Sequence, residues 1–570
     1  MLASLHSATC FYNSLFLEWR QQRLGTFQGQ NAFFVLLNPE QELVIPLKRH
    51  SRLGRHEYQG TFFIGTKGDY SSVSFSQSVE LMLNVLAKTE DEIQNIKNFV
   101  SRVKDSEENI RFSLKLRKSD FESIFTSLPD FKDAERALFV GHAFHPAPKN
   151  KTGFNQIDAK LFSPECGGQF PLRWFWVAND MIYQKSSEVF EDLGWLNKMW
   201  KEEFPHRPAI EGYQAFPMHP WQAQHILSMP IIQTYMKEGR MIEMNETGPD
   251  WYPTTSLRTI YRENADYMLK FSLNVKLTNS MRHLLEHELL RGLQVHEVFN
   301  TTEGKTLLET HPGFNVVFEP SYYAIKDENG APIKETFVVC RENSFKSDKV
   351  KHVVLAVLTQ DHPDFKENLL QTLIKKYAEE NKTDYAQASE KWFELYLKNA
   401  VAPMLDAQKN FGILLGAHQQ NLIIGIENNL PVKATFRDCH GTGYSPLGFE
   451  LFGKSVKSID IDNGNILNYE IANYLFTYYL IINSTFNVMT AIAQGNAVSE
   501  EKLIHQMRSF LEATLAEDPK DPSCIQYLLN DKVLQHKGNF LCSLRNINEN
   551  TAKNPLDIYV QIPNPFLVGK

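Results

Sequence analysis

Polar side chains flank an apolar hairpin pattern at residues 416–443, and this stretch constrains the fold more than any other part of the chain. Residues 422–424 and 432–436 are strand-like, and the residues between them include Gly, Asn and Pro, which favour a tight turn. A β-hairpin returns the residues that precede its first strand and those that follow its second strand to one end. We therefore expect Asn421 and Asp438 to lie close together.

Asn421 and Asp438 offer an amide oxygen and a carboxylate oxygen, the kind of ligand that Mg²⁺ prefers. Protein kinases hold their metal ions with a comparable Asn and Asp. The stretch thus predicts a nucleotide-dependent enzyme with Asp438 and Asn421 as metal ligands. Cys439 is conceivable as a nucleophile, but we favour a small residue that fills space beside a metal ligand.

Composition places the chain among globular proteins with large cores. It has 570 residues, of which 42% are hydrophobic and 22% charged, and this length predicts about two to four domains. A net charge of −8 and a pI near 6.2 argue against a nucleic-acid surface. Six scattered cysteines fit a reducing cytoplasm. We expect no signal peptide and no membrane span, since no run of about 20 apolar residues occurs.

Secondary-structure patterns change along the chain without an internal repeat or a long linker, so we expect lobes packed around one site. The pattern predicts a hairpin at 31–37 and 42–47, helices over 78–116 and 365–408, alternating strands and helices over 210–340, and mainly helices from 466 onward.

A cluster of hydroxyls and cations lies between residues 254 and 282. Residues 267–275 predict a strand that carries Lys270, and Thr278 is a plausible N-cap of a helix with Arg282 on its first turns. Ser256, Arg258 and Thr259 precede them. A helix N-terminus beside Arg and Lys favours anions, so this cluster predicts a site for a triphosphate and a carboxylate.

Two further motifs contain histidine. His142, His145, Lys149 and Lys151 share one loop-like segment and suit phosphate or carboxylate, although a surface loop with incidental cations is an equal alternative. His219 precedes a proline, which disfavours a helical conformation at that position, and we interpret it as part of a packed turn.

A third pattern suggests a different chemistry. His283, Glu286 and His287 match the HxxEH signature of inverted zinc peptidases, and on a helix the two imidazoles would share one face. Five-residue patterns of this kind arise by chance in long chains, so a zinc peptidase stays a minor alternative.

Taken in order, these elements resemble the NRPS-independent siderophore synthetases, the aerobactin-synthetase-like family. The resemblance covers residues 120–450 and rests on elements that follow one another as in that family: Gly141-His142-Ala143-Phe144-His145-Pro146 with Lys149, Lys151, Gly153 and Phe154; His219-Pro220-Trp221-Gln222; Ser256-Leu257-Arg258-Thr259; Lys270; Thr278 and Arg282; Ala417-His418-Gln419-Gln420-Asn421; and Arg437-Asp438. Each is weak alone, and their joint order is specific.

Three positions depart from the family pattern. Ala143 stands where the family has Pro, and Lys151 stands where it has Arg, which keeps the charge but loses the bidentate fork. Gly416 replaces a Glu that in relatives lies near the metal and nucleotide. A catalytically impaired ATP-binding pseudoenzyme is therefore an alternative to an active enzyme.

The resemblance implies an α+β fold with antiparallel sheets, arranged as a cupped hand of thumb, fingers and a kinase-like nucleotide-binding palm. We expect the thumb at 1–135, the fingers at 136–365 and the palm at 366–570, in a cytoplasmic homodimer. It implies an enzyme that uses ATP and Mg²⁺ to adenylate a carboxylic acid, typically citrate, and passes the acyl group to an amine or hydroxyl nucleophile, with release of AMP and pyrophosphate.

The family match also implies roles for individual residues. His145, Arg258 and Lys270 would bind the ATP phosphates, with Ser256 and Thr259 lining the same cradle. The nucleotide and Mg²⁺ would be served by Gln420, Asn421 and Asp438. The catalytic group, which would bind the carboxylate substrate and the developing charge, comprises Thr278, Arg282 and His418.

Overall fold

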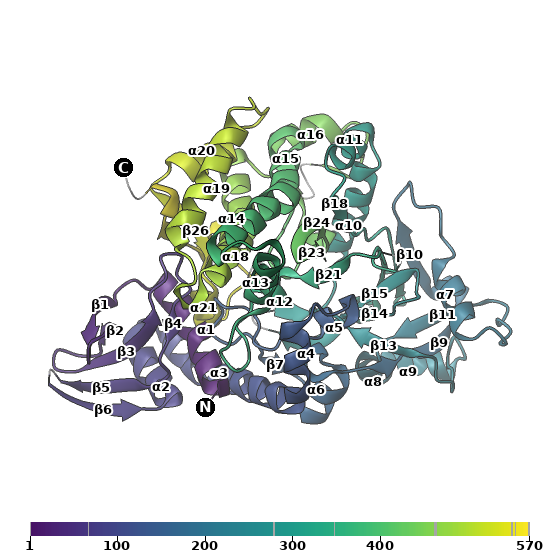
Figure 1. Ribbon diagram of the computed structural model, residues 1–570. Helices are drawn as coiled ribbons and strands as arrows, with labels where there is room; N and C mark the ends of the chain where they lie inside the picture. Colours follow the sequence, from purple (N-terminus) through teal and green to yellow (C-terminus); the bar gives the residue numbers. More distant parts are fainter. Residues whose placement is uncertain are drawn as a thin grey trace.

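An antiparallel six-stranded sheet made by the N-terminal residues lies at one side of the computed structural model (lower left in Figure 1). The described residues are 2–66, 68–277, 280–346, 348–460, 464–548, 551–552 and 554–567. The sheet consists of β1 (Arg23–Phe27), β2 (Gln30–Leu36), β3 (Glu42–Arg49), β4 (Glu57–Tyr58), β5 (Phe62–Thr66) and β6 (Asp69–Val73), and α1 (Leu2–Glu18) packs on one face. The predicted hairpin at 31–37 and 42–47 is confirmed as β2–β3.

The helical pattern predicted at 78–116 is divided into two helices, α2 (Phe75–Leu86) and α3 (Glu90–Leu116). Thr89 begins the second helix with a capping box, in which its side chain accepts from the backbone of Glu92 while the Glu92 carboxylate accepts from the backbone of Thr89. Three short helices follow: α4 (Phe121–Thr126), α5 (Phe131–Glu135) and α6 (Gln156–Phe162).

A seven-stranded antiparallel sheet carries most of the middle third of the chain. Its order is β10 (Ile182–Ser186), β19 (Ser321–Ile325), β20 (Val338–Glu342), β15 (Tyr267–Phe271), β14 (Thr259–Tyr261), β13 (Asp250–Pro253) and β8 (Phe170–Pro171). Beside it, at the right of Figure 1, lie β9 (Arg173–Ala178), β11 (Tyr213–Met218), β12 (Met241–Glu243), α7 (Trp195–Glu203), α8 (Pro220–Leu227) and α9 (Pro230–Lys237). Tryptophans 174, 195 and 251 are fully buried in this region, and His219 caps α8 as a packed turn, as predicted.

The strand predicted at 267–275 ends at Phe271, and the chain turns into β16 (Leu273–Leu277), which pairs with β7 (Lys151–Thr152) and β17 (Ser280–Arg282). Arg282 therefore lies on a strand, and its prediction on the first turns of a helix was wrong. Thr278, the predicted N-cap, lies outside the described residues. The helix that follows, α10 (Glu286–Phe299), starts later and is succeeded by α11 (Thr302–Thr310).

This late start removes the geometry of a zinc peptidase, because His283 precedes the helix and shares no helical face with His287. The side chain of His283 hydrogen-bonds Asn274 (2.7 Å), and Glu286 pairs with Lys185 (2.7 Å) and Tyr183. The zinc alternative is therefore wrong on structural grounds.

The hairpin predicted at 416–443 is confirmed. Strands β23 (Leu422–Glu427) and β24 (Leu430–Phe436) pair antiparallel around Asn428 and Asn429, both with positive φ, as a tight hairpin turn requires. They form a sheet with β18 (Phe314–Val316) and β21 (Lys351–Val354), in which β18 runs parallel to β24. Two small pairs complete the strands: β22 (Ile413–Leu414) with β25 (Gly443–Tyr444), and β26 (Val533–Lys537) with β27 (Tyr559–Pro563).

Helices dominate the remainder: α12 (Leu355–Thr359), α13 (Leu369–Asn381), α14 (Tyr385–Tyr396), α15 (Ala402–Phe411), α16 (Pro446–Phe452), α17 (Tyr469–Phe476), α18 (Phe486–Ile492), α19 (Glu500–Leu515), α20 (Ser523–Asn530) and α21 (Asn539–Arg545). The helices predicted over 365–408 and from 466 onward are confirmed, whereas α12 and α16 lie outside those ranges. A π-helical stretch, Thr477–Thr485, joins α17 to α18. The whole run Tyr469–Asn496 has the length and apolar composition of a membrane span, but 89% of its most apolar window is buried inside the structure, as in a core helix.

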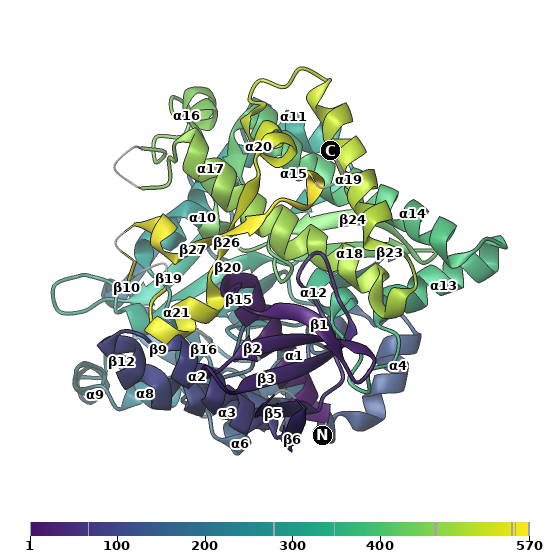
Figure 2. The same ribbon diagram turned by 90° about the vertical axis from the view of Figure 1, so that its left-hand side faces the viewer.

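The main hydrophobic core connects the two ends of the chain. It extends from Ala3 and Cys10 to Ile562 and Phe566, whereas a second core is confined to residues between Phe162 and Cys340. Figure 2 shows the N-terminal sheet in front, with the C-terminal helices α19 and α20 above it. The fold is thus α+β with mainly antiparallel sheets, and the division at residues 135 and 365 stays a prediction.

A carboxylate fastens the end of α1 to the start of α21. The two oxygens of Glu18 accept the backbone N–H groups of Phe540 (2.7 Å) and Leu541 (2.9 Å), which have no partner within their own helix.

We predict that Glu18→Ala costs about 1–2 kcal/mol of stability through loss of this cap. Backbone amides at Phe540 and Leu541 should exchange with solvent faster in the variant, which hydrogen-exchange mass spectrometry measures. The exposed Glu40→Ala serves as the control. Unchanged protection of α21 in Glu18→Ala would contradict this assignment.

Candidate active site

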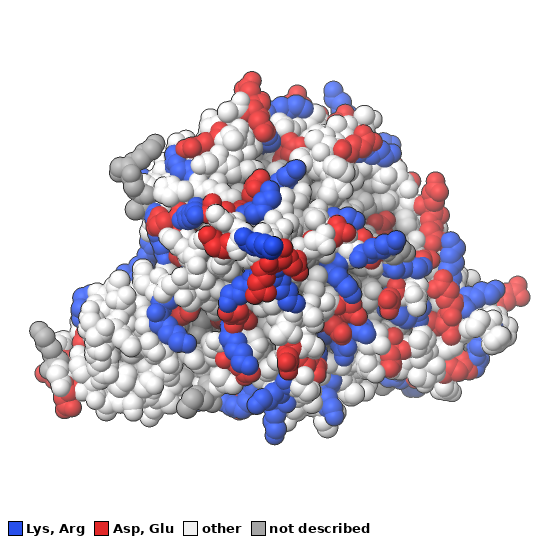
Figure 3. All heavy atoms as spheres, viewed as in Figure 1, with Lys and Arg blue, Asp and Glu red and all other residues white. Residues whose placement is uncertain are grey.

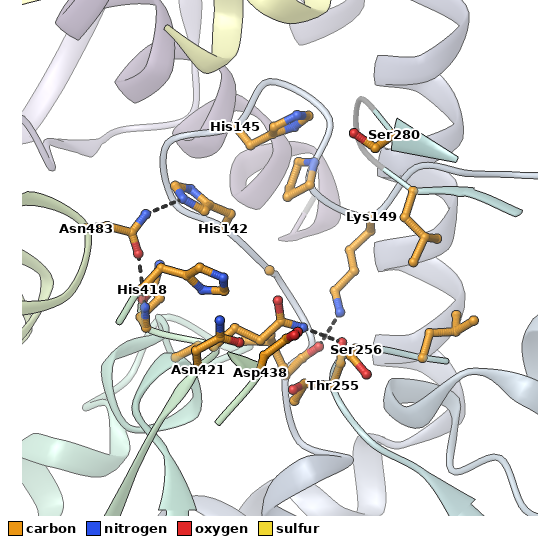
Figure 4. A pocket seen from close by; sticks show the side chains of 18 of the residues that line it. His142, His145, Lys149, Thr255, Ser256, Ser280, His418, Asn421, Asp438 and Asn483 are labelled. Carbon is orange, nitrogen blue, oxygen red and sulfur yellow. Dashed lines mark hydrogen bonds between the residues drawn. The ribbon is translucent and has the colours of Figure 1, made fainter. Parts of the chain in front are cut away.

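One cavity of about 330 Å³ collects side chains from the four segments 138–165, 255–282, 341–438 and 478–539 (Figure 4). Eight of the predicted site residues line it: His145, Ser256, Arg258, Arg282, His418, Gln420, Asn421 and Asp438. Thr259 and Lys270 are fully buried next to this set and do not line the cavity. The hairpin end and the upstream motifs, far apart in sequence, therefore belong to one site.

A tight turn before β14 presents Ser256 and Arg258. The backbone N–H of Thr259 donates to Ser256 Oγ (3.2 Å), and the carbonyl of Thr259 accepts from Thr254 Oγ1 (3.0 Å). Leu257 has φ 67°, a left-handed conformation that is strained for a leucine. Thr259 thus closes the turn rather than facing the cavity.

Arg437, the residue before Asp438, binds three separate segments together. Its guanidinium forms a buried ion pair with Glu135 of α5 and donates to Thr255 Oγ1 (2.9 Å) and to the carbonyl of Gln420 (2.9 Å). The backbone N–H of Thr255 also donates to Glu135 (2.8 Å), and Gln420 Nε2 donates to the carbonyl of Thr255 (2.7 Å). Arg437 therefore holds the turn and the hairpin end in register.

The loop with two histidines fixes both imidazoles in the same way. His142 Nδ1 accepts the backbone N–H of Phe144 (3.0 Å), and His145 Nδ1 accepts that of Ala147 (3.1 Å). In a neutral His145 ring the proton then resides on Nε2, whereas both ring nitrogens of His142 face N–H groups, those of Phe144 and of the Asn483 amide. Both rings lie on one side of the cavity in Figure 4, opposite Asn421 and Asp438. Burial lowers the pKa of His142 to about 3, so it is neutral at pH 7.

The two lysines of the same segment share one carboxylate. Lys151 pairs with the buried Glu165 and donates to Ser163 Oγ (2.9 Å), while Lys149 Nζ lies 3.5 Å from Glu165. Burial alone would raise the pKa of Glu165, but the two ammonium groups lower it to about 2. The segment is thus part of the cavity wall, and the alternative of a surface loop is excluded.

Beneath Asp438 lies a buried ionic cluster that the sequence did not indicate. Lys270 Nζ donates to Asp438 Oδ1 (2.6 Å), and Glu319 pairs with Arg341 Nε (2.7 Å). Burial by itself would raise the pKa of Asp438, but Lys270 and Arg341 hold it well below its usual range. Asp438 is therefore ionised, and its side chain retains 24% exposure toward the cavity.

Asp438 has φ 71°, the left-handed region that is uncommon for residues other than glycine. Such strain persists only where surrounding contacts enforce it, and here the ion pairs of Lys270 and Arg437 do so on both sides. Cys439, in contrast, is fully buried and its thiol pKa is raised well above normal, first by burial. It fills space, as we favoured, and is no nucleophile.

His418 lies between the hairpin end and the basic side chains. Burial lowers its pKa to about 4, with Asp438 acting in the opposite direction, so the imidazole is neutral at pH 7. The carbonyl of Gly416 accepts from the backbone of His418 (2.9 Å) and from Asn421 Nδ2 (3.3 Å). A Cβ at position 416 would meet only the backbone of Gly441, 3.5 Å from its carbonyl oxygen, so space for a Cβ does not demand a glycine there.

Five of the lining residues that sequence reasoning missed come from the C-terminal part of the chain. Tyr478, Tyr479 and Asn483 come from the π-helical stretch, and Lys537 and Asn539 from β26 and α21. The Asn483 side chain lies 2.7 Å from His142 Nε2 and accepts the N–H of Gln419 (3.0 Å). Short π-helical insertions often occur at functional sites, but no local pattern identified this one in the sequence.

The cavity is strongly basic although the chain as a whole is acidic. Seven lining side chains are Lys or Arg and two are acidic: Lys149, Lys151, Arg258, Arg282, Arg341, Arg437 and Lys537, against Glu165 and Asp438. On the face seen in Figure 3 the two signs alternate without such a concentration. Clefts that concentrate one sign attract ligands of the other, so the site suits polyanions, with Asp438 and Asn421 able to hold a metal ion among them.

Comparisons with known proteins found matching families and relatives. Residues 130–360 match the IucA / IucC family, and residues 390–552 match the family described as ferric iron reductase FhuF-like transporter. The chain is 36% identical to N(2)-citryl-N(6)-acetyl-N(6)-hydroxylysine synthase of Vibrio mimicus, over 98% of this chain and 95% of the relative. It is 30% identical to the spermidine-citrate ligase of Bacillus anthracis, over 90% and 86%.

A solved structure is similar over nearly its whole length. ATP-bound aerobactin synthetase IucA from Klebsiella pneumoniae superimposes with a TM-score of 0.91 at 29% identity, over 98% of this chain and 99% of that one.

We predict that Arg437→Met destabilises the protein by about 3–5 kcal/mol, because it leaves Glu135 buried without a counter-charge. Glu135→Gln in the same chain should restore part of the loss, since it removes that charge and keeps an acceptor for Thr255. Chemical unfolding of the single and double variants measures both.

The exposed Arg111, paired with Glu107, gives a matched control, for which Arg111→Met should cost no more than about 1 kcal/mol. Equal losses for Arg437→Met and Arg111→Met would show that Arg437 does not clamp the site.

Proposed function

The chain belongs to the IucA / IucC family of NRPS-independent siderophore synthetases, and on this premise we propose that it condenses citrate with an amine or hydroxyl nucleophile at the expense of ATP. The observation that carries the proposal is the basic cavity, which brings Arg258, Arg282 and His145 together with Asp438. A triphosphate and a tricarboxylate together need such an excess of positive charge.

The names of the relatives support citrate as the acid substrate more strongly than they support any one nucleophile. The name of the Vibrio relative contains a citryl group joined to a hydroxylysine derivative, and that of the Bacillus relative pairs citrate with spermidine. The higher identity to the first favours an N6-acylated N6-hydroxylysine as the nucleophile.

The proposed reaction is acyl adenylation. A citrate carboxylate oxygen attacks the α-phosphorus of the substrate ATP, and pyrophosphate leaves with the electrons of the broken P–O bond. The nucleophile then attacks the acyl carbon, loses a proton, and displaces AMP, which leaves with the former carboxylate oxygen. This gives the amide or ester.

The side chains have distinct tasks in this scheme. Arg258 and the Nε2–H of His145 bind the phosphates, with Ser256 beside them. Arg282 and the neutral His418 hold the carboxylate and the charge that develops during transfer, and Thr278 would assist them. Such fixed donors stabilise a transition state without reorganisation.

Gln420, Asn421 and Asp438 complete the nucleotide side. Mg²⁺, when bound by Asp438 and Asn421, would supply charge neutralisation between the phosphates. Asn421 is held toward the cavity by the carbonyl of Gly416, so the chain keeps two oxygen ligands despite the missing Glu. This observation favours an active enzyme over a pseudoenzyme.

The same site supports the comparison with kinases. Protein kinases pair a strand lysine with a glutamate near an aspartate and an asparagine that hold metal. The Lys270–Glu319 pair beside Asp438, with Asn421 lining the same cavity, supports the analogy. We propose accordingly a cupped hand with thumb 1–135, fingers 136–365 and a nucleotide-binding palm 366–570, acting as a cytoplasmic homodimer.

A matrix of acids and amines, read by mass spectrometry with ATP and Mg²⁺, tests the function. We expect product with citrate and N6-acetyl-N6-hydroxylysine, and pyrophosphate as the co-product. ATP binding without turnover across citrate, 2-oxoglutarate and succinyl compounds would favour the pseudoenzyme instead.

We predict that Asp438→Asn lowers kcat/KM for ATP by about 10²-fold or more, because the amide keeps the shape and loses the negative charge that holds metal. Arg282→Met should raise KM for citrate more than KM for ATP. Steady-state kinetics at varied Mg²⁺ measures both. Asp180→Asn, at an exposed position, is the control, and an Asp438→Asn enzyme with unchanged Mg²⁺ dependence would refute the assignment.

A further inference from the structure

A second cavity, of about 400 Å³, lies where the N-terminal sheet meets the C-terminal end of the chain. Its lining comes from residues between 16 and 33, from residues between 50 and 56, and from 486 and 562–565. It shares no lining residue with the active-site cavity. Small-molecule sites commonly enclose about 300–1,000 Å³, so the second cavity has the size of a separate ligand site.

The buried part of this lining is apolar. Phe16, Phe33 and Phe486 line the second cavity and are each at most 3% exposed. Further apolar residues lie around these rings: Leu17, Leu53, Ile562, Pro563 and Pro565. An apolar chain placed against them would be removed from water, which is favourable.

The more exposed part of the lining carries positive charge. Arg20 and His50 are exposed, and Arg52 is partly buried. Among the described residues that line the second cavity, none is Asp or Glu. Apolar surroundings with cations at their edge suit a molecule that combines an apolar chain with an anionic head.

Arg20 carries a charge that no carboxylate compensates. Arg52 already pairs with Glu501 and donates to the carbonyl of Pro565 (2.9 Å). Arg20, in contrast, forms no ion pair with an acidic side chain in the described part of the chain, and its Nε donates only to the carbonyl of Leu17 (3.4 Å). A guanidinium stays protonated at physiological pH, so a ligand carboxylate beside Arg20 would gain a charge-assisted hydrogen bond.

The acidic residues next to the cavity lining are engaged elsewhere. Glu18 follows Leu17 in the sequence, but its carboxylate caps α21. Glu500 accepts from Ser51 Oγ (2.9 Å) and from the backbone N–H of Arg52 (2.8 Å). Neither carboxylate therefore compensates Arg20.

We propose that the second cavity binds a small amphiphilic carboxylate, with its apolar chain against Phe16, Phe33 and Phe486 and its carboxylate on Arg20. Such a ligand would bridge the N-terminal sheet to α18 and β27, and a ligand that binds only the folded state stabilises it. The proposal does not rest on the proposed function, since no residue of the active-site cavity takes part.

Octanoate is the probe, and isothermal titration calorimetry is the measurement. The wild-type chain should bind one equivalent of octanoate and unfold at a higher temperature in its presence. Acetate, which has the head without the chain, and octan-1-ol, which has the chain without the charge, should each bind about 10-fold more weakly or worse. Saturating ATP should leave the affinity for octanoate unchanged, because the two cavities share no residue.

Arg20→Gln should weaken octanoate binding about 10-fold and leave octan-1-ol binding unchanged, a difference that a general loss of structure would not produce. Leu17→Trp should weaken both by filling the apolar part, and Pro563→Trp is a second filling variant in case the first destabilises the fold. Lys48→Gln is the matched control, since Lys48 is exposed on β3 of the same sheet and does not line the second cavity. It should bind octanoate as the wild-type chain does.

Octanoate binding that weakens in Arg20→Gln and not in Lys48→Gln supports the proposal. Absence of binding by the wild-type chain, equal binding by Arg20→Gln, or displacement of octanoate by ATP overturns it. Binding only after removal of residues 568–570 would assign the cavity to the chain's own end, and a dimer that is lost in Pro563→Trp without any octanoate binding would assign it to a second copy of the chain. Either result overturns the proposal, and none of these readouts needs turnover.

Discussion

The site depends on one buried set of ion pairs, in which Lys270 and Arg341 from neighbouring strands of the seven-stranded sheet meet Glu319 and Asp438. Asp438 belongs to the end of the β23–β24 hairpin, so the pairs connect two sheets from distant parts of the chain. Buried charges that are balanced and hydrogen-bonded tolerate removal of one partner poorly. The ion pairs therefore hold the seven-stranded sheet and the hairpin end in a fixed position relative to each other, on the two sides of the cavity.

Arg437 adds a second connection one residue away. It binds Glu135 from the N-terminal third and the turn at Thr255, so three segments converge on two consecutive residues of the hairpin end. Asp438 adopts a strained left-handed backbone conformation. This conformation lets the Asp438 carboxylate face the cavity while the side chain of Arg437, one residue earlier, reaches Glu135 of α5. Arg437 also holds Gln420 and Asn421, which precede the first strand of the hairpin, by hydrogen bonds to their carbonyl groups.

Local sequence patterns were sufficient for the hairpin and for the residues that it returns to one place. Apolar strand segments and turn chemistry are local signals. They identified β23 and β24 correctly, and Asn421 and Asp438 at the hairpin end line one cavity. The motif order placed His145, Arg258, Arg282 and His418 in the same site, and the cavity contains them all. The roles of these residues remain predictions.

The sequence-based predictions that failed have a common physical origin. Residues that become interaction partners only through tertiary packing leave no local signal in the sequence. Glu319, Arg341 and Glu135 are ordinary charged residues in sequence and become site-defining only where the fold brings them to Lys270 and Arg437. Arg282 was misassigned to a helix because the chain inserts a short strand before α10, and the same delay removes His283 from the zinc pattern. Thr278 lies outside the described residues, so its predicted role stays a prediction.

The central claim is that a carboxylate is activated by adenylation in the basic cavity. Citrate labelled with ¹⁸O in its carboxylates, incubated with ATP, Mg²⁺ and the nucleophile, tests it most directly. The account predicts one ¹⁸O in the AMP formed and none in pyrophosphate. Label recovered in inorganic phosphate with formation of ADP would mean an acyl phosphate instead, and would contradict the account.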